Sequence, residues 1–124
     1  MAETSRARPP SVLIVDDDDT GRYAAERVLK ADGFTVSCAG DGAAALSQLR
    51  VHDVDLMLCD IRMPGSIGGI ALARSARIAK PGLKVLLITA YEGPDAGDVK
   101  VLQRPISSTA LIAEIRAAIA GPRG

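Results

Sequence analysis

Two apolar runs in the chain each end on aspartate. The run Val12–Val15 is followed by four consecutive aspartates, Asp16 to Asp19, and the run Leu56–Cys59 is followed by Asp60. Continuous apolar runs of this length predict strands that are buried on both faces, as in a parallel sheet covered by helices. The carboxyl ends of such strands meet along one edge of the sheet, where α/β proteins bind their ligands. We therefore expect these two groups of aspartates to converge.

Converging carboxylates repel one another, since two of them about 4 Å apart cost roughly 4 kcal/mol at an effective dielectric near 20. Such a site must either hold protons, which raises the pKa of a carboxyl group, or bind a cation. Carboxylate oxygens suit Mg²⁺, which usually takes one or two protein carboxylates and completes its shell with water and phosphate oxygens. We therefore predict a Mg²⁺ site at Asp16, Asp17 and Asp60.

The composition indicates one soluble domain. The chain has 124 residues, 48% of them hydrophobic, and its 15 basic residues balance its 15 acidic ones. A net charge near zero disfavours both a nucleic-acid surface and a polybasic membrane patch. Residues 1–10 are polar and contain no apolar stretch, so we expect a disordered tail there, a folded domain over residues 11–121, and a cytoplasmic location. Cys38 and Cys59 are expected to be buried free thiols.

Short apolar runs alternate with longer helical patches along the chain, which predicts βα units on a parallel sheet. Asp19 or Thr20 can cap the first helix, which Gly33 ends, and Asp41 can cap the second. The expected strands are Ser11–Asp16, Thr35–Ala39, Asp55–Asp60, Lys84–Thr89 and Val99–Gln103. The third and last helices are expected at Gly69–Ala79, with Ile70, Ala73 and Ile78 near one face, and at Ser108–Ala120.

The connection between the last two strands is unusually short. Only Ala90 to Asp98 separate these strands, and Gly93, Pro94 and Gly97 interrupt the segment. A parallel crossover normally takes about a dozen residues or more, usually as a helix. We therefore expect a loop or a single turn here, so that the fourth helix of the fold is missing or very short.

Four motifs in order, VLIVDDDD, CDIRMPG, ITAY and LQRPI, resemble the receiver domain of two-component response regulators. The resemblance implies an α/β, flavodoxin-like, doubly wound five-stranded parallel sheet with strand order 2-1-3-4-5. It also implies a signalling module that is no enzyme beyond catalysing its own phosphotransfer and dephosphorylation. The implied partners are a sensor histidine kinase or histidine phosphotransfer protein and a downstream protein effector, with no nucleic acid and no membrane.

The resemblance assigns roles to individual residues. Asp60 matches the aspartate that accepts the phosphoryl group, and Thr89 matches the switch hydroxyl. Direct Mg²⁺ ligands would be Asp17, Asp60 and the main-chain carbonyl of Arg62, while Asp16 would act through bound water. Pro64 and Gly65 would shape the loop beyond the acceptor.

The sequence also departs from the family pattern. Arg104 stands where the family ordinarily has lysine, and Val101 stands where many receivers carry an aromatic switch residue, for which Tyr91 can substitute. A guanidinium is larger and flatter than an ammonium, so it can meet phosphoryl oxygens differently or hold the empty carboxylates. The short link removes a surface that many receivers use for output, so a partner must contact another face, such as that of the last helix.

The same residues allow other functional interpretations. A degenerate receiver, which binds partners without being phosphorylated, remains the alternative. An aspartyl phosphatase is disfavoured because Arg62, two residues beyond Asp60, cannot serve as general acid and base. A nucleotide-binding domain is disfavoured because aspartates replace the phosphate cradle after the first strand. Asp18 and Asp19 are expected to start a helix, His52 to face solvent, and Lys100 to lie away from the site.

Overall fold

The computed structural model describes residues 8–63, 67–91 and 95–121. In this part of the chain, strands and helices alternate until β4, which β5 follows without a helix between them. The elements are β1 (Ser11–Val15), α1 (Asp19–Ala31), β2 (Thr35–Ala39), α2 (Gly42–Val51), β3 (Leu56–Asp60), α3 (Gly69–Ala79), β4 (Lys84–Thr89), β5 (Lys100–Gln103) and α4 (Ser108–Ala120).

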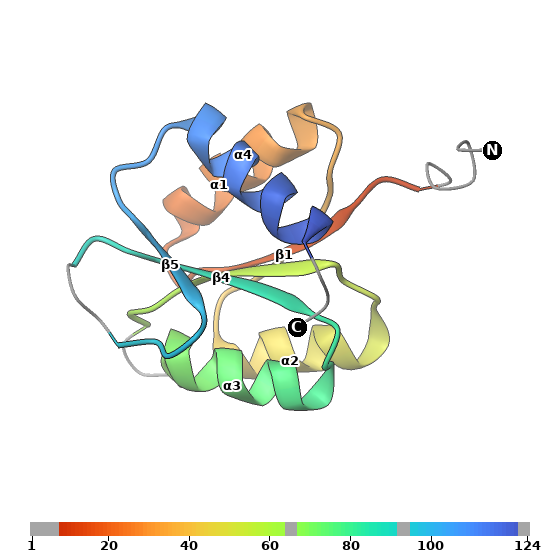
Figure 1. The fold of residues 1–124 in the computed structure, drawn as a ribbon, viewed down its shortest axis with the longest axis vertical. Helices are drawn as coiled ribbons and strands as arrows, with labels where there is room; N and C mark the ends of the chain where they lie inside the picture. The colour runs from red at the N-terminus through yellow and green to blue at the C-terminus, as the bar shows by residue number, and fades with distance from the viewer. Residues whose placement is uncertain (1–7, 64–66, 92–94, 122–124) are drawn as a thin grey trace.

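The five strands form one parallel sheet in the order β2-β1-β3-β4-β5. Helices α1 and α4 cover one face of the sheet, and α2 and α3 cover the other (Figure 1). The predicted fold class and the missing fourth crossover helix are therefore confirmed. None of the helices in the described ranges has the length and hydropathy needed to cross a membrane.

Strand β1 shows why the apolar runs are continuous. Val12 and Ile14 pack into the core under α1 and α4, whereas Leu13 and Val15 pack into the core under α2 and α3. All four side chains are at most 2% exposed. Both faces of a parallel sheet are covered in this way, so the four residues that follow Ser11 in the strand are all apolar.

The start of α1 agrees with the prediction that Asp18 and Asp19 begin the helix, and it excludes Asp19 and Thr20 as the cap. Asp18, rather than Asp19 or Thr20, is the N-cap: its backbone is extended and its carboxylate accepts a hydrogen bond from the Gly21 N–H at 2.9 Å. Asp19 is the first helical residue instead. The predicted cap of α2 is confirmed, because Asp41 accepts from the Ala44 N–H at 2.8 Å.

The predicted inner face of α3 was partly wrong. Ile78 is 77% exposed, and the buried positions of the helix are Gly69, Leu72, Ala73 and Ala76. At about 100° per residue, Ile78 lies about 140° around the helix from Ala73, so the two side chains cannot share one face. The position of Ile78 around the helix axis, and not its apolar side chain, determines that it is exposed.

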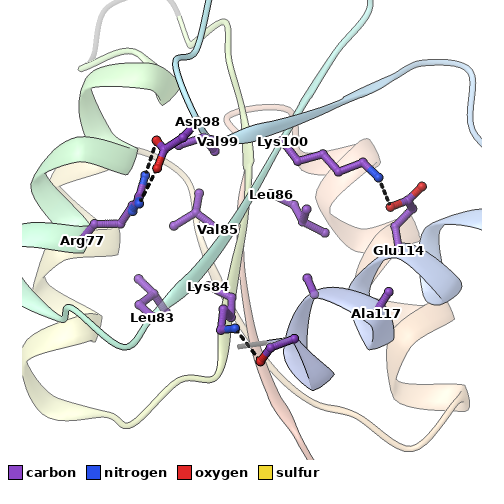
Figure 2. A pocket seen from close by; sticks show the side chains of 12 residues that line it. Arg77, Leu83, Lys84, Val85, Leu86, Asp98, Val99, Lys100, Glu114 and Ala117 are labelled. Atoms are coloured by element: carbon purple, nitrogen blue, oxygen red, sulfur yellow. Dashed lines mark hydrogen bonds and ion pairs between the residues drawn. The ribbon is translucent and has the colours of Figure 1, made fainter. Parts of the chain in front are cut away.

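Strand β5 leaves the lower part of β4 uncovered. The register pairs Lys100 with Leu86, so β4 extends two residues, Lys84 and Val85, beyond the start of β5. A groove of about 440 Å³ lies at this edge between α3 and α4 (Figure 2). Two ion pairs border it, Arg77 with Asp98 and Lys100 with Glu114.

The disordered tail predicted for residues 1–10 falls largely outside the described residues and stays a prediction. Pro10 itself is tied to the sheet, because its carbonyl accepts a hydrogen bond from the Thr35 N–H at 2.9 Å.

Helix α3 begins directly behind the end of β3. The Gly69 N–H donates to the Ile61 carbonyl at 2.9 Å. A Cβ added at Gly69 would lie 2.3 Å from the Asp60 carbonyl oxygen and 2.7 Å from the Ile61 Cα. These neighbours are backbone atoms, so they cannot move aside without moving Asp60. The absence of a side chain at Gly69 therefore sets the position of the β3 tip.

We expect Gly69→Ala to lower the free energy of unfolding by about 2–3 kcal/mol, since overpacking at a rigid contact costs that much. The matched control is Gly68→Ala, whose added Cβ would meet only the Ile61 carbonyl at an ordinary 3.7 Å. This control should change the free energy of unfolding by less than about 1 kcal/mol. Urea denaturation followed by circular dichroism measures both, and equal losses would contradict the close-contact explanation.

Candidate functional site

The tips of β1 and β3 bring three aspartates together. Asp16, Asp17 and Asp60 each offer a carboxylate oxygen, and these oxygens all lie within 4.8 Å of one another. Asp16 is buried, Asp60 is half-buried and Asp17 is exposed. The cluster therefore runs from the edge of the core out to solvent, and an ion or a small anionic group can approach it from the Asp17 side.

Asp16 forms the buried end of the cluster. One carboxylate oxygen accepts from the Asp18 N–H at 2.9 Å, and its main-chain carbonyl accepts from the Arg22 guanidinium at 2.6 Å. Burial, together with the charge of Asp60, raises the pKa of Asp16, and the Asp18 N–H and the Arg104 guanidinium offset only part of that rise. The ionised cluster is thus held at a cost in stability.

Asp60 accepts hydrogen bonds through both carboxylate oxygens and is still partly exposed to solvent. Its Oδ1 accepts from the Arg62 N–H at 3.1 Å, and its Oδ2 accepts from the Arg104 guanidinium at 3.3 Å. The Asp60 side chain keeps 16% of its surface exposed, against 8% for Asp16. Asp60 is therefore oriented and reachable at once.

Arg104 joins the acidic cluster from the end of β5. Its backbone N–H donates to the Thr89 carbonyl at 2.7 Å, which pins the residue beside β4. Its two terminal nitrogens lie 3.3 Å from an Asp60 oxygen and 3.5 Å from an Asp16 oxygen. The guanidinium fork thus bridges two carboxylates, a geometry that the single nitrogen of a lysine cannot reproduce.

Thr89 lies at the end of β4 and is 1% exposed. Its hydroxyl oxygen accepts from the Tyr91 N–H at 3.1 Å, so the hydroxyl hydrogen remains to be donated. The Tyr91 ring is 56% exposed and lies under the Arg62 guanidinium, whose carbon is 4.6 Å from the ring centroid. The sequence analysis did not predict this contact between the Arg62 and Tyr91 side chains, for which no spacing signal exists.

The other residues that the sequence analysis singled out have the following places in the structure. Asp18 caps α1 and Asp19 pairs with Arg22, so neither joins the cluster. His52 is exposed at the end of α2. Lys100 pairs with Glu114 at 2.8 Å. Pro64 and Gly65 lie outside the described residues.

The two cysteines have no contact that favours redox chemistry. Cys59 is fully buried beside Asp60, and burial raises the pKa of its thiol to about 12. Burial also raises the pKa of Cys38. Thiols with raised pKa values carry almost no thiolate at neutral pH, and the thiolate is the reactive form. The predicted burial is confirmed for Cys59 and wrong for Cys38, which is half-buried.

The donor chemistry of the cluster fits a hard divalent cation. Three carboxylates bring three negative charges to one place, and the guanidinium of Arg104 supplies one positive charge in return. Oxygen-only sites with excess negative charge are the type that Mg²⁺ prefers. The exposed Asp17 leaves room for the waters that Mg²⁺ usually retains.

Comparison with known proteins agrees with this geometry. The sequence profile of the response regulator receiver domain matches residues 12–116. The transcriptional regulatory protein ZraR of Escherichia coli is 33% identical over 116 residues, which cover 88% of this chain and 26% of ZraR. The transcriptional regulatory protein CseB of Streptomyces avermitilis is 32% identical over 120 residues, or 91% of this chain and 50% of CseB.

A solved structure shows the same fold. The response regulator protein TrrA of Thermotoga maritima, crystallised in complex with Mg²⁺-BeF, superposes with a TM-score of 0.78 at 27% identity, covering 88% of this chain and 98% of TrrA. The chain belongs to the response regulator receiver domain family. It spans 26% of the length of ZraR and 50% of the length of CseB. Receiver domains are signalling modules of two-component systems.

The raised pKa of Asp16 has a consequence for stability. A carboxyl whose pKa is raised by folding binds protons more tightly in the folded state, so its contribution opposes folding above that pKa and vanishes below the unfolded value, 3.8. With EDTA present, Asp16→Asn should therefore raise the free energy of unfolding at pH 7. The gain should shrink as the pH falls through the raised pKa toward 3.8. Urea titrations at several pH values measure it.

The control for this experiment is Asp53→Asn. Asp53 is exposed, and its carboxylate lies 3.8 Å from the Lys80 ammonium, which makes the ion pair a weak one. Its effect should be small, since exposed pairs contribute about 0–1 kcal/mol. A destabilising Asp16→Asn at pH 7 without divalent ions would contradict the assigned cause.

Arg104 should compete with a divalent ion for the cluster. We expect Arg104→Gln to lower the melting temperature in EDTA and to increase Mg²⁺ affinity about fivefold, the equivalent of a cation contributing about 1 kcal/mol. Arg116→Gln, which removes a guanidinium paired with Asp32 at the C-terminal cap of α1, is the matched control and should leave Mg²⁺ affinity unchanged. Titration calorimetry measures both affinities, and weaker binding by Arg104→Gln would refute the competition.

Proposed function

We propose that this receiver domain accepts a phosphoryl group on Asp60 from a histidine kinase or a histidine phosphotransfer protein. The observation that carries the proposal is the environment of the Asp60 carboxylate. It accepts hydrogen bonds from the Arg62 N–H and from the Arg104 guanidinium, and its side chain is still partly exposed to solvent. Asp16 is more deeply buried than Asp60, and Asp17 is exposed. Asp60 is therefore the carboxylate best placed to act as a nucleophile.

In the proposed step, an Asp60 oxygen forms a bond to phosphorus while the bond from phosphorus to the donor imidazole nitrogen breaks. The electron pair of the broken bond leaves with the imidazole. Arg104 can donate its N–H groups to the transferred oxygens, and Thr89 can donate its free hydroxyl hydrogen. Both residues then stabilise negative charge that the acceptor alone would repel.

We assign the direct Mg²⁺ ligands to Asp17, Asp60 and the main-chain carbonyl of Arg62, with Asp16 acting through bound water. The ion, when bound, offsets the negative charge of the phosphoryl group. The convergence of the three carboxylates within 4.8 Å supports this assignment. Burial keeps Asp16 from the surface, which supports an indirect role for it.

One observation favours a second candidate function, a degenerate receiver that binds its partner without phosphorylation. Arg104 spans Asp60 and Asp16 with distances of 3.3 and 3.5 Å. This internal cation partly neutralises the cluster in the absence of any ligand. A site that is already bridged has less need of a metal or a phosphoryl group, so the two candidates must be separated by experiment.

We further propose that the modified domain signals by binding a protein effector in the cytoplasm. The absence of a direct nucleic-acid or membrane partner stays a prediction that follows from the balanced charge. ZraR and CseB are named as transcriptional regulatory proteins, and the chain covers 26% and 50% of their respective lengths.

The test is incubation with acetyl phosphate and Mg²⁺, followed by intact-mass measurement. The wild type should gain the mass of one phosphoryl group, and Asp60→Ala should gain none. Asp98→Ala, which loses only an exposed ion pair with Arg77, should be modified like the wild type. Arg104→Lys shows whether the arginine slows the chemistry.

An adduct that survives in Asp60→Ala would place the acceptor elsewhere. No adduct on the wild type, together with normal folding, would favour the degenerate receiver.

A further inference from the structure

The Arg62 and Tyr91 side chains close a circuit of contacts around the acceptor. Arg62 is tied to Asp60 by its backbone N–H, and Tyr91 is tied to Thr89 by its backbone N–H, each at 3.1 Å. The two side chains then meet, with the guanidinium carbon 4.6 Å from the ring centroid. The loop after β3 and the loop after β4 are thereby joined on the solvent side of the site.

The cation–π contact between Arg62 and Tyr91 is weaker than a hydrogen bond from the same guanidinium to a phosphoryl oxygen would be. Arg62 is exposed, and within the described ranges no carboxylate forms an ion pair with its guanidinium. Tyr91 is 56% exposed, so water competes for the cation. A charge-assisted hydrogen bond to a phosphoryl oxygen is stronger than a solvent-exposed cation–π contact. The guanidinium will therefore leave the ring if a phosphoryl oxygen comes within reach.

We propose that Arg62 is a positioning residue that senses modification of Asp60, and that Tyr91 is the surface group it releases. The inference rests on the proposed function, since it requires a phosphoryl group on Asp60. That group adds up to two negative charges two residues away from Arg62. The guanidinium moves from the ring of Tyr91 to a phosphoryl oxygen, and the ring becomes free to contact a protein partner.

Thr89 supplies a second connection to the same tyrosine. Its hydroxyl oxygen is bonded to the Tyr91 N–H, so a shift of the hydroxyl toward a phosphoryl oxygen shifts the Tyr91 backbone as well. Val101 on β5 is half-buried and has no polar atom on its side chain to take part. The connections through Arg62 and through the Thr89 hydroxyl therefore both lead to Tyr91 rather than to Val101.

The chain composition allows Tyr91 to be observed directly. The protein has two tyrosines and no tryptophan, so Tyr23→Phe leaves the Tyr91 phenol as the single tyrosine fluorophore. Beryllium fluoride with Mg²⁺ stands in for the phosphoryl group, and fluorine NMR measures its uptake independently. We expect a saturable change in Tyr91 emission on uptake. Arg62→Ala should lose most of this change at full uptake, and Arg62→Lys should restore it.

The matched control is Arg27→Ala in the same background. Arg27 makes the corresponding contact with Tyr23, at 5.9 Å on α1, and its removal should leave the Tyr91 change intact. If Arg62→Ala takes up no beryllium fluoride, the neutral variant Arg62→Gln replaces it. Uptake with an emission change that is independent of Arg62 overturns this inference and leaves the proposed function standing. No uptake by the wild type overturns both.

Discussion

The repulsion among carboxylates at the tips of β1 and β3 is the constraint on which the rest of this structure depends. Parallel pairing of β1 with β3 fixes the two tips side by side, so Asp16 and Asp60 cannot separate without breaking the sheet. Burial raises the pKa of Asp16, and the nearby charge of Asp60 raises it further. The surrounding elements offset this repulsion with hydrogen bonds from main-chain N–H groups and with the guanidinium of Arg104.

The groups that offset this repulsion come from three segments that lie far apart in the sequence. The Asp18 N–H belongs to the start of α1, the Arg62 N–H to the loop after β3, and Arg104 to the end of β5. Each is delivered by an element whose other side packs into one of the two cores. The stability of the domain and the electrostatics of the site are therefore linked, and a substitution at Gly69 or Asp16 affects both.

Much of the fold followed from the sequence because a parallel sheet leaves strong signals. The runs around Leu13 and Met57 could only be strands covered on both faces, and the short segment after Thr89 left no room for a helix. The burial of Ile78 was wrongly predicted, since the angle around a helix outweighs residue type. The Arg62–Tyr91 contact was not predictable, because it joins two loops whose side-chain directions no periodic pattern encodes.

The shortness of β5 has a consequence for how the site moves. β5 is a four-residue edge strand paired only with β4, whereas β1 and β3 lie inside the sheet with neighbours on both sides. Edge strands with few buried contacts fray at a lower free energy than central ones. Arg104 follows this edge strand, while Asp16 and Asp60 lie at the ends of the two interior strands β1 and β3. We therefore expect local opening of β5 to carry the guanidinium away from the two carboxylates before the carboxylates separate from each other.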